Sequence, residues 1–62
     1  MCQATVYLAE DGQEEEIMRD LILLEPVEDG LRLQAFFEEP RVVKARVGRI
    51  DFLKHSVTLI PT

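Results

Sequence analysis

The chain has 62 residues and a net charge of −5, and this length accommodates one small core, so we expect a single domain over residues 1–62. The negative charge argues against a general affinity for nucleic acid, because contacts to phosphate require basic side chains. No apolar run approaches the roughly 20 residues that cross a bilayer, and no basic segment followed by an apolar one marks a secretory signal. We therefore expect a cytoplasmic protein without a membrane segment.

The small size of the chain predicts self-association. A domain this short buries only roughly 60% of the surface that its unfolded chain exposes, so small scaffolds usually add a disulfide, a metal or a partner subunit. The single cysteine, Cys2, excludes an internal disulfide, and no Cys/His cluster resembles a structural zinc site. We therefore expect a homodimer, and the free thiol suits a reducing compartment.

The first half of the chain predicts two strands and a tight turn. Residues 2–8 alternate apolar and polar side chains, which is typical of a half-buried strand, and Asp11-Gly12 favours a hairpin turn. Residues 13–25 are ambiguous, because glutamates ahead of helically spaced apolar residues favour a helix. The apolar run at 21–24 is instead typical of a strand buried on both faces. The neighbouring turn signals favour the strand, which we adopt.

The second half of the chain predicts further strands. Asp29-Gly30 repeats the turn chemistry, and residues 31–37 alternate clearly. Residues 43–52 form the next predicted strand, and their apolar parity changes after Gly48, as it does at a β-bulge.

A last turn and strand complete the predicted fold. Residues 53–55 form the turn, and residues 56–60 alternate again. Five short strands, tight turns and one bulge in about sixty residues indicate an all-β fold, a small and strongly bent barrel.

Cys2 has the most distinctive chemistry in the sequence. A free cysteine is most often a buried small hydrophobe, and that interpretation stays open. The position of Cys2 beside Met1 offers a second interpretation, metal binding, because the α-amine, a backbone amide nitrogen and the thiolate lie within two residues. Such donors form fused five-membered chelate rings and suit the planar preference of Ni(II) and Cu(II). Met1 and Cys2 are therefore the candidate metal ligands, and two chains that meet near their N-termini would each supply a thiolate.

The remaining candidates favour structural roles. His55, the only histidine, falls in an expected turn, so an exposed turn residue is favoured over a metal ligand. Met18 is expected to fill the core, and Glu14-Glu15-Glu16 to form a solvated acidic edge. With no nucleophile–base pair and no glycine-rich phosphate loop, we expect that the protein is not an enzyme.

An uneven charge distribution supports one alternative. After Pro40 only Asp51 is acidic, against five basic residues: Arg41, Lys44, Arg46, Arg49 and Lys54. A basic segment of this kind supports the alternative that the chain is a small β-barrel that binds RNA. Acidic and basic segments that face each other would explain the charge pattern equally well.

Three segments resemble the CooT family: residues 1–8, residues 15–18 and residues 48–55. The resemblance runs over nearly the whole chain and implies an SH3-like barrel of five to seven strands that forms a homodimer. It also implies that Cys2, with the backbone donors of Met1 and Cys2, binds Ni(II). The implied role is a metallochaperone, nickel carrier or sensor, with carbon monoxide dehydrogenase or its maturation proteins as partners. The loop at 38–40 departs from the family, because it lacks the glycine expected there.

Overall fold

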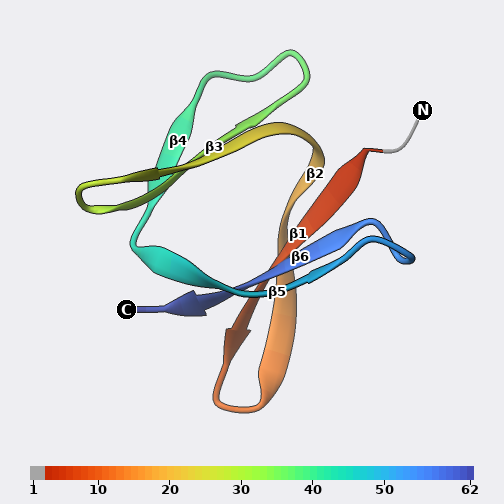
Figure 1. Cartoon of the computed structure of the whole chain (residues 1–62), viewed down its shortest axis with the longest axis vertical. Coiled ribbons are helices and arrows are strands. Elements are labelled where there is room, and N and C mark those ends of the chain that lie inside the picture. The colour runs from red at the N-terminus through yellow and green to blue at the C-terminus, as the bar shows by residue number, and fades with distance from the viewer. Residues whose placement is uncertain (1–2) are drawn as a thin grey trace.

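A computed structural model of the chain describes residues 3–62, so the candidate ligands Met1 and Cys2 lie outside the described residues. Within this range six strands form one sheet (Figure 1). The strands are β1 (Ala4–Glu10), β2 (Gln13–Val27), β3 (Gly30–Ala35), β4 (Arg41–Val43), β5 (Ala45–Asp51) and β6 (Ser56–Pro61).

The sheet curls because one long strand, β2, serves two partners. The strand order is β4-β3-β2-β1-β6-β5, and all neighbours are antiparallel except β1 and β6. The first part of β2 pairs with β1 and its last part with β3, and Leu21 is opposite both Ala4 and Ala35. The prediction of an all-β, barrel-like fold is confirmed.

The ambiguous segment at 13–25 is a strand, as adopted from its turn signals. Asp11 and Gly12 both have positive φ values, 54° and 78°, which bring Gln13 back opposite Glu10. The prediction that residues 21–24 are buried on both faces is wrong, because Ile22 and Leu23 are exposed. The pairing with β3 is irregular between Leu21 and Leu23, and this is where β2 changes partner and bends.

Two further boundaries differ from the prediction. The expected strand 43–52 corresponds to two strands. The chain passes at Lys44 from β4, which pairs with β3, to β5, which pairs with β6. The expected strand 31–37 ends at Ala35, and Phe37 has a φ of 62° in the turn that follows. The predicted bulge at Gly48 is confirmed by a register shift between Val47 and Arg49.

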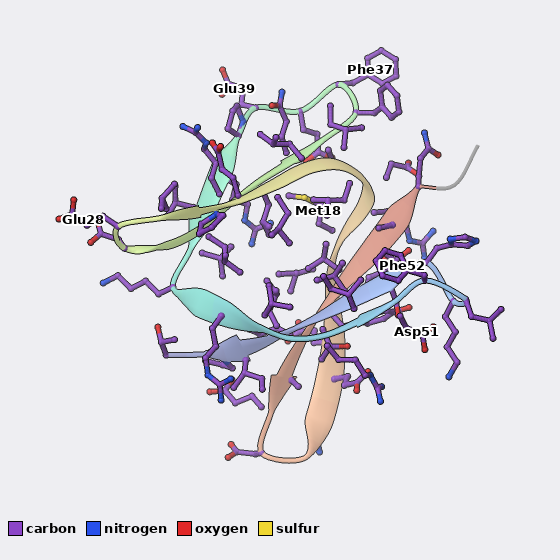
Figure 2. All side chains as sticks on the ribbon, viewed as in Figure 1. Met18, Glu28, Phe37, Glu39, Asp51 and Phe52 are labelled. Atoms are coloured by element: carbon purple, nitrogen blue, oxygen red, sulfur yellow. The ribbon has the colours of Figure 1, made fainter. Side chains whose placement is uncertain are left out.

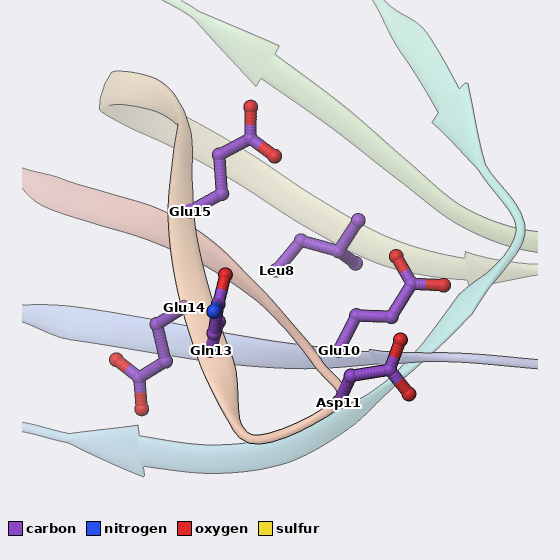
Figure 3. A pocket seen from close by; sticks show the side chains of 6 residues that line it. All are labelled: Leu8, Glu10, Asp11, Gln13, Glu14 and Glu15. Atoms are coloured by element: carbon purple, nitrogen blue, oxygen red, sulfur yellow. The ribbon is translucent and has the colours of Figure 1, made fainter.

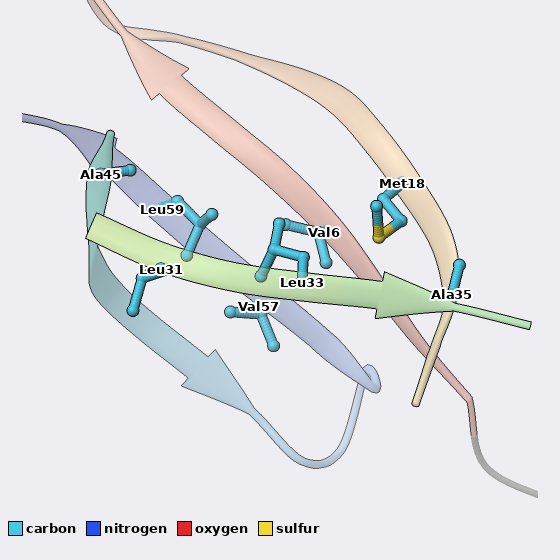
Figure 4. Packing of buried hydrophobic residues seen from close by; sticks show 8 residues of the cluster. All are labelled: Val6, Met18, Leu31, Leu33, Ala35, Ala45, Val57 and Leu59. Carbon is cyan, nitrogen blue, oxygen red and sulfur yellow. The ribbon is translucent and has the colours of Figure 1, made fainter. Parts of the chain in front are cut away.

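The core is small and lies inside the curl (Figure 4). Its buried side chains are Val6, Met18, Leu31, Leu33, Ala35, Ala45, Val57 and Leu59. Met18 is thus a core residue, as predicted. Burying one Val or Leu contributes about 1.5–3 kcal/mol, which leaves little margin in a domain with this few core side chains. Within the described part of the chain there is no helix long and apolar enough to cross a bilayer.

Candidate functional site

Four parts of the sheet meet where β1 begins. Ala4, Leu21 and Ala35 lie in one row across β1, β2 and β3. The parallel pairing of β1 with β6 places the β5–β6 turn beside the same point, and the amide nitrogen of Thr5 donates to the carbonyl oxygen of His55 at 2.9 Å. Cys2 precedes Gln3, the first described residue, so β1 is the element that follows the candidate metal ligands in sequence.

Large exposed apolar side chains lie on β2, on β5 and in the turns that follow β3 and β5, and we call this set the apolar end. Its residues are Ile22, Leu23, Phe36, Phe37, Ile50, Phe52 and Leu53. Phe52 and Leu53 are 82% and 90% exposed, and Phe37 is fully exposed. In Figure 2, Phe37 and Phe52 lie on either side of the start of β1. Clustered exposed apolar side chains mark interaction sites, because solvent exposure of such surface is unfavourable.

A hollow of about 260 Å³ lies at the apolar end beside the start of β1. Ala4, Ile50, Phe52 and His55 are among the residues that line it. His55 is exposed and has a φ of 53° in the β5–β6 turn, as expected of a turn histidine. The hollow therefore combines apolar walls with one imidazole.

The β5–β6 turn is held by Asp51. Its Oδ1 accepts hydrogen bonds from the amide nitrogens of Leu53 and Lys54, each at 3.0 Å. These bonds, with the positive charges of Lys54 and Arg49 nearby, lower the pKa of the Asp51 carboxyl below its ordinary value of 3.8. The turn that carries Phe52 and Leu53 is thus fixed by a charged side chain at its base.

The acidic residues at the opposite end of β1 do not form a metal site. A hollow of about 520 Å³ lies at the β1–β2 turn. Figure 3 shows the side chains that line it: Leu8, Glu10, Asp11, Gln13, Glu14 and Glu15. Among residues 3–62, however, no three His, Cys, Asp or Glu side chains are grouped so that they could hold an ion. Glu14, Glu15 and Glu16 are exposed, as predicted for a solvated edge.

The basic residues after Pro40 separate on the structure. The Arg41 guanidinium donates to the carbonyl oxygen of Ile17 in β2 at 3.4 Å. Arg49 and Lys54 instead line one groove together with Tyr7. The two described side-chain ion pairs, Arg19–Glu16 and Arg32–Glu25, join residues at or before position 32. Glu14 of the acidic half nevertheless lines the same groove as Arg49 and Lys54.

Fold and surface together define a class: a small barrel-like β protein that has no group of three His, Cys, Asp or Glu side chains able to hold a metal in residues 3–62 and that presents an exposed apolar end. The family model described as CO dehydrogenase accessory protein CooT matches residues 1–60, and the chain belongs to the CooT family. The predicted family resemblance is confirmed, and the family's description is that of an accessory protein to an enzyme.

A solved structure agrees with this assignment. The crystal structure of a protein assigned as CooT from Carboxydothermus hydrogenoformans is similar to this chain, with a TM-score of 0.89 and 28% sequence identity. The match covers 98% of each chain. The comparison with curated proteins finds no match.

We did not predict the apolar end from the sequence, although the sequence carries a signal for it. Phe36-Phe37 and Phe52-Leu53 are pairs of consecutive large apolar residues beside expected turns. Both pairs lie in turns just after a strand ends, where neither side chain faces the inside of the sheet, and all four side chains are exposed. The groove beside Tyr7 gave no such signal, because the cross-strand register brings its residues together.

Proposed function

We propose that this chain is a nickel-carrying accessory protein that holds Ni(II) through Cys2 and serves the maturation of carbon monoxide dehydrogenase or another nickel enzyme in the cytoplasm. The observation that carries the proposal is the family match over residues 1–60, a range that contains Cys2. In this role nickel is cargo, so the site must both bind the ion and release it to an acceptor.

The donor chemistry of the first two residues supports the choice of metal. A thiolate and adjacent nitrogen donors favour Ni(II), whereas structural zinc requires four tetrahedral ligands. The described residues offer no competing cluster, since no three ligating side chains meet among them. The imidazole of His55 is the one nitrogen ligand of its type in the sequence, and it lines the hollow at the start of β1.

The proposal includes a homodimer that forms through the apolar end. A standard protein interface buries about 800 Å² on each partner, roughly a sixth of the 4667 Å² that this chain exposes. Phe37, Phe52 and Leu53 supply large apolar side chains for such a contact, and covering them would stabilise a domain with a small core. A contact here would also bring the two Cys2-bearing segments to one interface.

A nickel titration of the reduced protein, followed by ultraviolet-visible absorbance, tests the metal assignment. Thiolate-to-nickel charge-transfer bands should rise to a sharp end point in the unmodified chain and be lost in C2S. His55→Gln is the matched control, because it removes the imidazole that lines the hollow at this end of the sheet and should leave the bands in place. Saturable bands of full intensity in C2S would contradict the assignment.

A further inference from the structure

A groove on the outer face of the sheet shares only Ser56 with the hollow at the apolar end. It crosses four strands, since Tyr7 of β1 pairs with Glu16 of β2 and with Thr58 of β6, and Thr58 pairs with Arg49 of β5. The groove has a volume of about 280 Å³. Its lining residues are Tyr7, Glu14, Arg49, Lys54, Ser56 and Thr58.

Two cations and three hydroxyl groups converge on this groove. Within residues 3–62 neither Arg49 nor Lys54 belongs to a side-chain ion pair. A guanidinium presents two parallel N–H donors that match the oxygens of a phosphate, and an ammonium adds a mobile positive charge. Thr58 is only 9% exposed, so its side chain forms part of the inner wall rather than the outer rim.

The acidic groups around the groove limit which ligand it suits. Glu14 lines it, and a carboxylate there repels a second anionic group but accepts hydrogen bonds from hydroxyls. Asp51 lies close enough to lower the local positive potential, but its Oδ1 already accepts two amide N–H groups in the β5–β6 turn. The groove therefore favours a ligand with one phosphate and a neutral part rich in hydroxyls.

We propose that this groove binds a nucleoside monophosphate unit, with the phosphate on Arg49 and Lys54 and the ribose hydroxyls near Glu14. Tyr7 supplies an aromatic ring against which a base can stack. The groove's volume lies just below the range of about 300–1,000 Å³ that is typical of small-molecule sites. A groove of this size suits one nucleotide and not several. The unit is either a free nucleotide or one residue of a single-stranded RNA.

Amide chemical shifts of the nitrogen-15-labelled protein, measured during titration with AMP, test the proposal. We expect saturable shifts at Tyr7, Ser56 and Thr58, and a loss of affinity of about tenfold or more in R49Q/K54Q, because both charged donors are removed. The charge-matched control K44Q/R46Q changes basic residues that do not line the groove, and it should bind AMP almost as tightly as the unmodified chain.

Three further titrations define what would overturn the proposal. Adenosine should bind far more weakly than AMP, and inorganic phosphate should bind more weakly than AMP. Equal affinity for phosphate and AMP, or an equal loss in both double variants, would contradict the nucleotide site. A hexameric oligoadenylate that binds more tightly than AMP, with a steep salt dependence, would identify RNA as the source, whereas equal affinity would identify the free nucleotide. C2S should bind AMP normally, so this site can fail or hold independently of nickel binding.

Discussion

Gly30, at the start of β3, packs against the end of β4, and its replacement by alanine is the sharpest test of how the sheet curls. Gly30 begins β3 with a φ of 148°, a conformation that residues with a Cβ rarely adopt. A Cβ at this position would lie 2.2 Å from the carbonyl oxygen of Val43 and 3.0 Å from the Cα of Lys44. Both neighbours are backbone atoms, so they cannot move aside by changing a rotamer.

The cost of Gly30→Ala has two parts. Backbone strain of this kind costs about 1–3 kcal/mol, and forced overpacking costs about 1–3 kcal/mol more. Gly12→Ala is the matched control, because Gly12 also has a positive φ, 78°, but a Cβ there would meet nothing within 4 Å. We expect a loss of about 1–2 kcal/mol for Gly12→Ala and of about 2–6 kcal/mol for Gly30→Ala.

Equilibrium urea unfolding of both variants, monitored by circular dichroism at one protein concentration, measures these losses. A domain of this size is stabilised by only about 3–9 kcal/mol, so Gly30→Ala should be strongly destabilised or partly unfolded at 25 °C. Equal stability losses in the two variants would refute the close approach of β4 to the start of β3.

Three other predictions concern the core, the β5–β6 turn and the apolar end. Leu59→Ala removes a fully buried side chain and should cost about 2–5 kcal/mol in the same unfolding assay, whereas a loss below about 1 kcal/mol would contradict its burial. Asp51→Ala should lower the melting temperature near neutral pH. The pKa of Asp51 is lowered from 3.8 in the folded protein, so its stabilising effect is present above that pH and is lost as the pH falls through the lowered pKa. The melting temperatures of the variant and the unmodified protein should therefore converge in acid. F52S/L53S should change the stability of the monomer by less than about 0.5 kcal/mol, since both side chains are exposed. The same variant should shift sedimentation toward the monomer. The control Val42→Ser, at an exposed residue outside the apolar end, should leave sedimentation unchanged.

The strands were predictable where side-chain alternation and turn chemistry agree. Residues 2–8 alternate, and Asp11-Gly12 sets the hairpin, so the pairing of β1 with β2 follows from local signals. The phase change at Gly48 likewise marks the bulge in β5. The exposure of Ile22 and Leu23 was not predictable, because it depends on where β2 changes partner, and an apolar run alone carries no information about that bend.

The candidate site divides in the same way. The chemistry of Cys2 follows from its residue type and its neighbour Met1, and it remains a prediction because both residues lie outside the described range. The position of His55 beside β1 depends on the parallel pairing of β1 with β6, which joins segments about fifty residues apart in sequence. Contacts at such a separation arise from the closure of the whole sheet and have no local sequence signal.

Nickel K-edge X-ray absorption of the reduced protein, loaded with less than one equivalent of Ni(II), tests the central claim most directly, because it identifies the atoms bound to the metal. The account predicts a sulfur shell in the unmodified protein and in His55→Gln, and its replacement by nitrogen and oxygen neighbours in C2S. A spectrum of the unmodified protein that contains only nitrogen and oxygen neighbours would contradict nickel binding through Cys2.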